Sequence, residues 1–383
     1  MGTKISMKKK ILVFYPHNFL ELSSGTHKRI TELMVYFAER EMTVDIFSIN
    51  GFTNTWRTEN SIRSELFREK FLFNWRYPLK GRKLNDLRRM FRRLEDFALP
   101  AMKRQFEEVA ENGCYDYIFI SYVYWANLVD NVKSGIKIMD CHDLVSLNAH
   151  LLSGQGEFKY GRMFQDEVCA LDKFDYVFCI SEEESVIMSS FASRPRFVNV
   201  PTAMPRKFSR DIVSDNTFDY DLVFVGSGDN RFNRDGLIWF VERVMPLRPA
   251  LKVAVAGNVC DHLSGARNLK LLNYVKDLED VYKRSKAVIC PLRGGTGLKI
   301  KVAEALSYGK PVITTKWGLS GILQKENNGC IVASDEKSFV EAIDRIINDR
   351  DYYELVRRQA MDFFQRKFSR DICWKNLDEL FST

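Results

Sequence analysis

A glycine-rich segment at residues 291–306, with the sequence PLRGGTGLKIKVAEAL, holds the residue types best suited to chemistry in this chain. An apolar stretch at 287–290 predicts a strand that enters the glycine turn, and the residues after the turn predict an amphipathic helix. Backbone N–H groups at the start of a helix bind anions, and glycines allow a phosphate group to come close. Lys299 and Lys301 add positive charge, and Glu304 can accept hydrogen bonds from two ribose hydroxyls. The segment therefore predicts a binding site for a nucleoside diphosphate.

The same segment also allows a purely structural interpretation. Glycine turns occur where a helix only packs tightly against a strand, and Lys301 with Glu304 could form a solvated helix pair that contributes ~0.2–0.5 kcal/mol. The order of strand, three glycines, two lysines and a glutamate favours phosphate binding.

A second glycine turn follows another apolar stretch, residues 222–225. Asn233 could cap the helix after this turn. Arg231 could bind a phosphate through two hydrogen bonds. Ordinary turn chemistry is the alternative for this shorter motif, which consists of Gly226, Ser227 and Gly228.

Composition limits the class of protein and its compartment. A chain of 383 residues with 45% hydrophobic residues can form two domains of ordinary size. The eight cysteines include no C-x-x-C pair and no metal-binding spacing with histidine, so we expect reduced thiols, no disulfide framework and no bound metal. The basic residues 1–10 precede only a short apolar run, and no stretch reaches the ~20 apolar residues of a membrane helix. We therefore expect a cytoplasmic protein, either free or peripheral at the inner face of the membrane.

Positive charge is concentrated in one region of the chain. The net charge is +7, and the stretch from Arg63 to Arg104 contains thirteen Lys or Arg against five Asp or Glu. Apolar residues lie between its arginines, which predicts an amphipathic basic helix. We expect this helix to attract anionic lipid head groups, or an acidic lipid-linked or glycan acceptor, through Arg88, Arg89, Arg92 and Arg93. A solvated helix face is the alternative, and nucleic acid is disfavoured because no motif for reading RNA or DNA accompanies the charge.

Alternating strand and helix patterns predict an α/β protein with two domains. Apolar stretches at 10–15 and 44–49 enclose a helical pattern at about 27–40, and a similar series starts again at 222–225. Such repeats form doubly wound parallel sheets, so we expect two Rossmann-like domains that face each other across a cleft. The expected boundaries are an N-terminal domain at 1–200 with a basic helical insertion at about 60–110, a linker at 201–220, a C-terminal domain at 221–365 and a final helix at 366–383.

The segment at 291–306, with the turn and strand after it, resembles the donor site of GT-B glycosyltransferases of the group 1, family 4 kind. The resemblance covers most of the chain, at residues 7–50, 220–257 and 269–292, but not at residues 52–115. It implies a GT-B architecture in which the N-terminal domain takes the acceptor and the C-terminal domain takes the nucleotide sugar. It also implies that the last helix packs back on the first domain.

The resemblance further implies which residues bind the substrates. It places the nucleotide base against the backbone of Val275 and the diphosphate against the glycine turns. The acceptor-side residues that it implies are Gly25, Thr26 and His27. The donor-binding residues are Gly226, Ser227, Gly228, Arg231, Val275, Gly294, Gly295, Thr296, Gly297, Leu298 and Lys301.

One position departs from the family pattern. The family commonly has two glutamates eight residues apart, and the residue eight positions before Glu304 is Thr296. A subgroup of polysaccharide transferases has the similar pattern Gly-x-Gly-x-Lys-x-Lys-x-x-Glu. The difference concerns the usual contact to hydroxyls of the donor sugar and leaves the diphosphate site intact.

Asp140 and His142 are the catalytic candidates in the first half of the chain. They follow an apolar stretch at 137–139, and polar residues at the end of such a strand would point into the cleft. The resemblance implies a histidine near the sugar ring, and Asp140 could instead act as a general base in an inverting transfer. Capping of the next helix, above all by Asp143, is the structural alternative.

These features predict a glycosyltransferase that moves a sugar from a nucleotide-diphosphate donor to a glycan or lipid-linked glycan acceptor, as in polysaccharide biosynthesis. Lys299, Lys301 and the helix start would stabilise the leaving diphosphate, and Glu304 would hold the ribose. The resemblance implies retention of configuration, with no metal and no cofactor besides the nucleotide-sugar substrate. Two alternatives stay open: a GT-B-fold sugar-nucleotide epimerase that uses carboxylates for proton transfer, and a non-catalytic scaffold that binds a nucleotide sugar.

Overall fold

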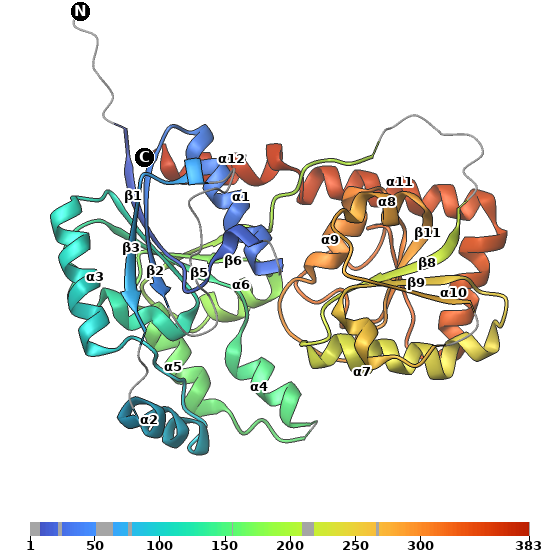
Figure 1. Cartoon of the computed structure of the whole chain (residues 1–383), viewed down its shortest axis with the longest axis horizontal. Coiled ribbons are helices and arrows are strands. Elements are labelled where there is room, and N and C mark those ends of the chain that lie inside the picture. The colour runs from blue at the N-terminus through green and yellow to red at the C-terminus, as the bar shows by residue number, and fades with distance from the viewer. Residues whose placement is uncertain are drawn as a thin grey trace, which may run out of the picture. The chain divides into compact units, whose positions relative to one another are not determined.

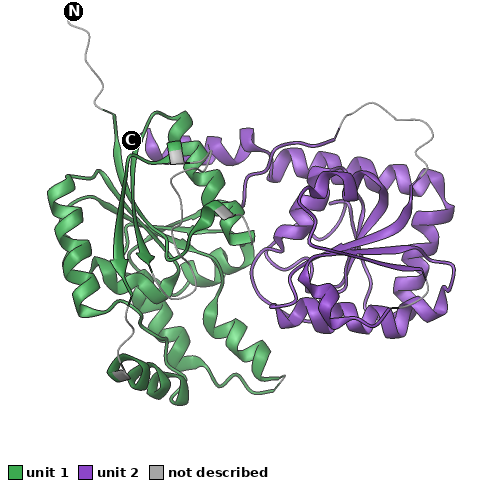
Figure 2. Ribbon diagram, in the orientation of Figure 1, with its two compact units in different colours: residues 1–200 green, residues 201–383 purple. Residues whose placement is uncertain are grey.

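The computed structural model describes residues 8–21, 25–50, 64–75, 79–154, 156–208, 218–265 and 268–382. The chain forms two compact units, Met1–Val200 and Pro201–Thr383, and each is an α/β domain built on one parallel sheet (Figure 1, Figure 2). Part of the expected linker, 209–217, and parts of the expected insertion, 60–63 and 76–78, lie outside the described residues.

Within the described residues, the sheet of the first unit has seven parallel strands in the order β3-β2-β1-β4-β5-β6-β7. The strand order reverses between β1 and β4, and doubly wound sheets bind their ligands at such a point, beyond the carboxyl ends of the strands. Strands such as β4 are buried throughout because both faces of a parallel sheet are covered. The strands are β1 (Lys10–Phe14), β2 (Thr43–Asn50), β3 (Glu69–Asn74), β4 (Tyr117–Ser121), β5 (Ile136–Cys141), β6 (Tyr176–Cys179) and β7 (Arg196–Asn199).

Several helices between these strands bury a mostly apolar face. In α1, the residues Ile30, Leu33, Met34 and Phe37 recur at helical spacing and are buried. The helices of the first unit are α1 (Gly25–Glu39), α2 (Leu79–Met90), α3 (Pro100–Gly113), α4 (Val145–Ser153), α5 (Gly161–Leu171) and α6 (Glu182–Ser189), with short 3-10 turns η1 (Phe19–Glu21), η2 (Ser64–Leu66) and η3 (Val123–Val129).

Two features of the basic region differ from the sequence expectation. The segment at 60–110 contains a strand as well as helices, because β3 pairs with β2 and forms the edge of the sheet. The basic helix also ends earlier than expected, at Met90. Arg92 then takes a positive φ of 52°, which stops the helix, so Arg92 and Arg93 lie in the chain that follows α2.

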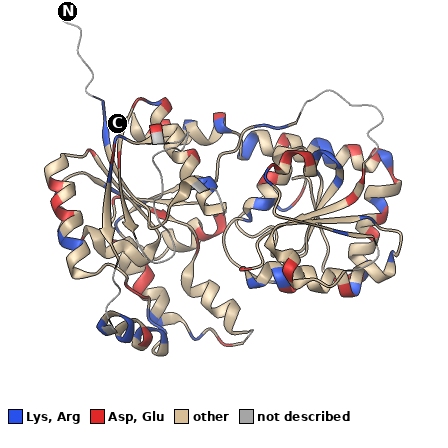
Figure 3. Cartoon of the chain, viewed as in Figure 1, with Lys and Arg blue, Asp and Glu red and all other residues tan. Residues whose placement is uncertain are grey.

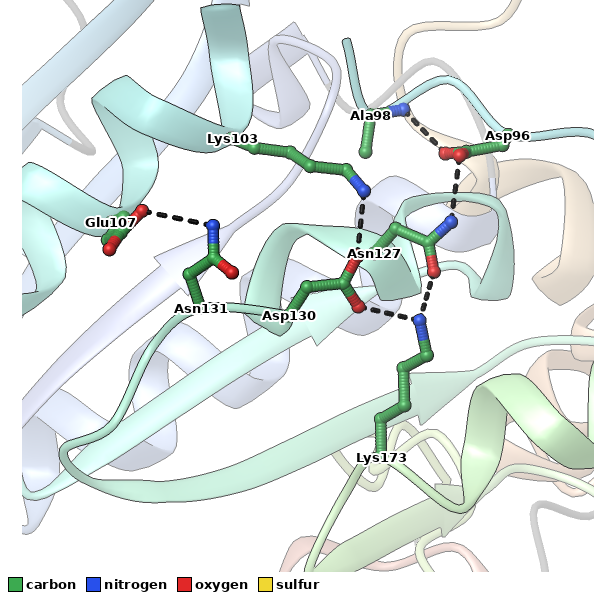
Figure 4. A network of polar contacts seen from close by, with 8 residues as sticks. All are labelled: Asp96, Ala98, Lys103, Glu107, Asn127, Asp130, Asn131 and Lys173. Carbon is green, nitrogen blue, oxygen red and sulfur yellow. Dashed lines mark hydrogen bonds and ion pairs between the residues drawn. The ribbon is translucent and has the colours of Figure 1, made fainter. Parts of the chain in front are cut away.

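A polar network joins α3 and η3 to the chain between α5 and β6 (Figure 4). Asp130 accepts hydrogen bonds from Lys103 Nζ at 2.7 Å and from Lys173 Nζ at 2.6 Å. Asn127 donates to Asp96 Oδ2 at 2.7 Å and accepts from Lys173. These charge-assisted bonds bring together residues that are distant in the sequence, so they help to fix the packing around the sheet.

The second unit repeats the same architecture. Its described strands form a six-stranded parallel sheet in the order β10-β9-β8-β11-β12-β13, and the order reverses between β8 and β11. The strands are β8 (Tyr220–Val225), β9 (Val253–Ala256), β10 (Leu269–Asn273), β11 (Ser285–Cys290), β12 (Val312–Thr314) and β13 (Cys330–Val332).

The helices of the second unit include α7 (Arg231–Trp239), α8 (Leu278–Lys283), α9 (Ile300–Ser307), α10 (Glu336–Asn348), α11 (Arg350–Lys367) and α12 (Arg370–Phe381), with the one-turn segments η4 (Phe240–Val244), η5 (Met245–Leu247) and η6 (Asn258–His262). The residue that caps α7 is Asn230, whose side chain accepts from the backbone of Phe232 and Asn233. Asn233, which we expected to be the cap, lies inside the helix. None of the helices in the described residues is long and apolar enough to cross a membrane.

Candidate active site

The strand order brings the two glycine turns of the second unit together. The turn after β8 begins at Gly226 and the turn after β11 contains Gly294, Gly295 and Gly297, and β8 and β11 are neighbours in the sheet. A Cβ atom at Gly226 would lie 2.8 Å from the ammonium of Lys301, so the first turn approaches this lysine closely. Two segments about seventy residues apart therefore form one local structure.

Lys301 is the centre of this structure. Its Nζ donates a hydrogen bond to Asn233 Oδ1 at 2.7 Å and lies 4.3 Å from the centre of the Phe224 ring. The amide of Asn233 in turn donates to the carbonyl of Ser227 at 2.9 Å. Burial of its ammonium, with the nearby charge of Lys299 as a smaller cause, lowers the pKa of Lys301 to about 8. An anion bound at the turns would place a negative charge next to this ammonium.

The turn before α9 has the backbone geometry that its glycines permit. Gly295 and Gly297 have φ values of 103° and 69°, which residues with a side chain rarely adopt. Lys299 directly precedes α9, and its Nζ donates to the carbonyls of Thr296 at 2.5 Å and Gly297 at 3.1 Å. The hydroxyl of Thr296 is buried and has no hydrogen-bond partner among the described residues. Leu298 is buried and anchors the turn.

The same turn packs on α7. A Cβ at Gly294 would lie 2.5 Å from the Phe232 ring, and one at Gly236 would lie 2.5 Å from the carbonyl of Pro291. Close packing therefore accounts for Gly294 without any ligand, as the structural interpretation of this motif requires. The unpartnered hydroxyl of Thr296 has no such explanation.

Glu304 lies in the second turn of α9 and has a protein partner. The hydroxyl of Tyr282 donates to Glu304 Oε2 at 3.3 Å, and the Tyr282 ring stacks on Tyr308 at 4.5 Å. Burial, followed by the charge of Glu304, raises the pKa of Tyr282 well above its ordinary value, so its hydroxyl stays protonated. The carboxylate keeps further acceptor capacity for hydroxyl donors.

The other donor candidates lie around these turns. The backbone N–H of Gly228 donates to Asn258 Oδ1 at 2.9 Å. Arg231 is largely exposed, and its guanidinium pairs with Asp235 one helical turn away, at 3.1 Å. Val275 is half-buried and follows β10, at the opposite edge of the sheet from β13.

In the first unit, Asp140 and His142 lie at the carboxyl end of β5. Asp140 is inside the strand and completely buried, and Arg29 of α1 donates to its Oδ1 from Nε at 2.9 Å and from Nη2 at 2.5 Å. His142 Nε2 lies 3.0 Å from the other oxygen, Oδ2. Burial alone would raise the pKa of Asp140, but the charges of Arg29 and His142 outweigh it and lower the pKa, so the group is a carboxylate.

The acceptor-side candidates open α1 near the same edge. Gly25 and Thr26 are the first residues of the helix, and His27 is buried beside Tyr15, with ring centres 6.0 Å apart. Burial and the neighbouring His17 lower the pKa of His27 to about 4, so its imidazole is neutral at pH 7. This edge can offer hydrogen bonds and ring faces to a neutral hydroxyl-rich ligand.

A comparison with known proteins shows which proteins this chain resembles. Residues 219–349, which include β8, β11 and α9, match the family model described as glycosyl transferases group 1. A 44.6 kDa protein of the cps region of Klebsiella pneumoniae is 23% identical over 344 residues, which cover 82% of this chain and 86% of that protein. The protein is a glycosyltransferase of the GT-B fold.

A second curated relative and several solved structures resemble this glycosyltransferase. The capsular polysaccharide biosynthesis glycosyltransferase CapM of Staphylococcus aureus is 28% identical over 119 residues, or 30% of this chain and 31% of CapM. Sucrose-phosphate synthase from Thermosynechococcus elongatus has a TM-score of 0.73 at 17% identity, with 98% of both chains covered. Anabaena HepE, in complex with UDP and glucose, has a TM-score of 0.67 at 12% identity, with 98% of this chain and 100% of HepE covered. At these identities the solved structures establish the fold.

Sequence reasoning missed several residues at the two sites of the glycosyltransferase. Arg29 is a charged residue on the otherwise apolar face of α1, and that position was a usable signal. The sequence contains no signal for the contacts of Asn233 and Tyr282, because their partners Lys301 and Glu304 lie 68 and 22 residues away. Within the described part of the chain, no group of three or more His, Cys, Asp or Glu is placed to hold a metal ion.

Proposed function

We propose that this glycosyltransferase moves a sugar from a nucleotide-diphosphate donor to a glycan or lipid-linked glycan acceptor in polysaccharide biosynthesis. The observation that supports it most is the contact between the Gly226 turn and Lys301 at the carboxyl ends of β8 and β11. The buried ammonium of this half-buried lysine, beside backbone turns, suits a diphosphate. The relatives CapM and the cps-region protein favour a polysaccharide product, and the UDP bound in HepE favours a nucleotide donor.

In the proposed reaction the protein mainly stabilises charge. The diphosphate would bind at the start of α9, where backbone N–H groups and the two lysines neutralise the charge that develops on the leaving group. Glu304 would accept hydrogen bonds from the ribose, and the unpartnered hydroxyl of Thr296 would bind the donor where the family's first glutamate is missing. This chemistry needs no metal and no protein nucleophile, and it suits retention of configuration.

The decisive experiment measures donor binding and product formation together. Thermal-shift and calorimetric screens with UDP, ADP, GDP and their sugars should identify a nucleoside diphosphate that binds more tightly than its monophosphate. Lys301→Met should lose this preference, whereas Lys337→Met, at an exposed position of α10, should keep it. Sugar transfer to an acceptor glycan then confirms the function. Conversion of the nucleotide sugar without any acceptor would instead indicate an epimerase, and binding without turnover would indicate a scaffold.

We also propose that α2 attaches the glycosyltransferase to an anionic membrane surface. Four large apolar side chains at and just after α2 are exposed: Leu84 (54%), Leu87 (49%), Met90 (66%) and Phe91 (55%). The buried side of the helix is polar, since Asn85 donates to the carbonyl of Asp96 and accepts from its N–H. The leucines are therefore not used to hold α2 on its unit, and α2 also carries several Lys and Arg residues (Figure 3).

The structure revises which basic residues this proposal uses. Arg88 donates to the carbonyl of Leu94, Arg89 pairs with Glu95 at 2.6 Å, and Arg93 pairs with Asp166 at 2.6 Å. Of the four arginines, these three therefore hold the segment in place. The exposed cations Lys80 and Lys83 at the start of α2 are better placed for lipid head groups.

A further inference from the structure

Helix α2 buries a polar stripe and exposes an apolar one, which is the reverse of an ordinary surface helix. Within residues 80–90, only Gly81, Asn85 and Arg88 are partly or fully buried. These three residues are separated by four and then three positions, so they lie on one face of the helix. The face by which α2 contacts its unit is therefore made of a glycine, an amide and a guanidinium.

The exposed apolar stripe is the buried stripe displaced by one residue. Leu84 and Leu87, which are 54% and 49% exposed, directly precede Asn85 and Arg88. Since successive residues of an α-helix lie about 100° apart around its axis, a rotation by one residue would bring both leucines inward and expose the amide and the guanidinium. Burial of apolar surface favours the rotated arrangement. Polar contacts must therefore hold α2 in the orientation that the structure shows.

Asn85 makes two of these contacts with a single residue. Its Nδ2 donates to the carbonyl of Asp96 at 2.9 Å, and its Oδ1 accepts from the N–H of Asp96 at 3.1 Å. The asparagine is 3% exposed, so a rotation would break both bonds at a buried position, where lost hydrogen bonds are costly. On the same face, Arg88 Nη1 donates to the carbonyl of Leu94 at 2.8 Å.

The segment that receives these hydrogen bonds is itself fixed to the unit. Asp96 Oδ2 accepts from Asn127 of η3 at 2.7 Å, and Asn127 accepts in turn from Lys173 (Figure 4). The other oxygen of Asp96, Oδ1, accepts from the N–H of Ala98 at 3.0 Å. The partner of Asn85 therefore has a defined position, and this position determines the rotation of α2 about its axis.

We propose that Asn85 and Arg88 are positioning residues that hold α2 with its polar stripe inward, so that its two leucines stay available to an anionic membrane surface. The membrane as partner rests on the proposed function, whereas the orientation of the helix does not. Lys80 and Lys83 are exposed on the same helix, and their charge complements anionic lipid head groups. A buried asparagine in a coiled coil has a comparable role, because it selects one packing arrangement at a cost in apolar burial.

The first test reads the exposure of the leucines in solution and needs no membrane. Hydroxyl-radical footprinting with mass spectrometry compares the oxidation of Leu84 and Leu87 with that of Leu128, which is 1% exposed. Asn85→Ala with Arg88→Ala removes the polar contacts, so rotation becomes favourable and the oxidation of both leucines should fall toward that of Leu128. Unchanged oxidation of both leucines in this variant would overturn the proposal.

Two further variants separate the hydrogen bonds from side-chain size and charge. Asn131→Ala with Lys133→Ala removes one amide and one cation at exposed positions of the same unit, and should leave the two leucines as reactive as in the parent. Arg88→Lys keeps a donor for the carbonyl of Leu94 and should also retain their reactivity. A loss of reactivity in either variant as large as in the Asn85→Ala, Arg88→Ala pair would mean that these hydrogen bonds do not set the orientation.

The second test asks whether the orientation serves the membrane contact. Asn85→Ala with Arg88→Ala should reduce sedimentation with vesicles of phosphatidylcholine and phosphatidylserine at least roughly tenfold, which is about the contribution of one leucine side chain. The Asn131→Ala, Lys133→Ala control should sediment as the parent does. Buried leucines with undiminished vesicle binding would refute the membrane contact and leave the orientation device standing. Leucines that stay exposed, with vesicle binding intact, would refute the device and leave the membrane proposal standing.

Discussion

At the scale of single residues, the two lysines of the proposed donor site make different contacts. Lys299 already has hydrogen bonds to two carbonyls of its own turn, whereas the ammonium of Lys301 is buried against Asn233 and an aromatic ring. Lys299 can stabilise the turn, a bound ligand or both. Lys301 has a lowered pKa and gains most from a bound anion.

Lys299→Ala is expected to weaken binding of a nucleoside diphosphate roughly 10- to 100-fold, since one charge-assisted hydrogen bond contributes ~1.5–3 kcal/mol. The monophosphate should lose less, because the proposed site places the diphosphate beside this lysine. Isothermal titration with UDP and UMP, and with Lys337→Ala as the control, measures both losses. Equal losses for the two nucleotides would mean that Lys299 only supports the turn.

The affinity for nucleoside diphosphate should fall as the pH rises through about 8. Lys301 has its pKa lowered to about 8, so its charged form predominates below this pH and its neutral form above it. Between pH 7 and pH 9 we expect up to a roughly tenfold loss of affinity for UDP, since one pH unit above a pKa leaves about a tenth of the group charged. Calorimetry on the parent and on Lys301→Met checks this, because the variant should have a flat profile. The same slope in the variant would assign the titration to another group.

Glu304→Gln should weaken the binding of ribonucleotides roughly tenfold and that of 2′,3′-dideoxynucleotides much less. The reason is that an amide offers one acceptor oxygen where the carboxylate offers two. Tyr282→Phe is the control, since it removes the internal partner of Glu304 but leaves the carboxylate. Competition binding with the two nucleotide types measures the difference. Should Glu304→Gln weaken both types equally, the carboxylate has a structural role through Tyr282.

At the scale of elements, α2 differs from α1 and α3. The buried residues of α3 are apolar and most of those of α1 are, whereas α2 is held through Asn85 and keeps leucines on its exposed side. A helix that exposes apolar side chains next to cations is typical of a membrane interface. The ion pair between Arg93 and Asp166 joins the segment after α2 to α5, and this contact fixes the direction of the exposed face of α2.

Replacement of Leu84, Leu87 and Phe91 by serine should abolish sedimentation with vesicles that contain anionic phosphatidylserine, and UDP binding should be unaffected. Lys80→Gln with Lys83→Gln should weaken sedimentation by ~1 kcal/mol per residue, and added salt should weaken it further. The matched control is Leu355→Ser, at an exposed apolar position of the second unit. Absence of vesicle binding by the parent protein at low salt would refute the membrane proposal.

At the scale of the whole molecule, each unit has its own sheet and its own core. The core of the first unit is built around residues of β1, β4 and α3, and that of the second around β8, β9 and α10. Ligand binding to one unit should therefore stabilise that unit first, because the two hydrophobic cores are separate.

UDP at one hundred times its dissociation constant should stabilise the second unit by ~2.7 kcal/mol. Hydrogen exchange on the full chain should then slow at residues 226–234 and 291–306 and across the sheet of that unit, with little change at β1 to β7. Lys301→Met at the same UDP concentration serves as the control and should show much less protection. Equal protection of both units would contradict separate stabilisation.

The sequence by itself determined the architecture of both units and the position of the two glycine turns. Strand and helix periods are local properties, and a glycine turn between a strand and a helix is recognisable because its φ values exclude other residues. The glycines at 295 and 297, the lysines and Glu304 all come from one short segment, so their shared location needed no tertiary information.

Only the tertiary structure decided what these residues contact. Asn233 reaches Lys301 across 68 positions of sequence, and Arg29 reaches Asp140 across 111. No local pattern encodes such pairs, because they arise when parallel strands bring separate loops to one edge of a sheet. The edge strand β3 and the end of α2 at Met90 were missed for a related reason, since the propensity of an edge strand depends on its neighbours and a single left-handed residue has a weak local signal. The residue types that suit the 291–306 segment to phosphate binding are thus visible in the sequence. The hydrogen bonds and the pKa of each side chain depend on residues that are distant in the sequence.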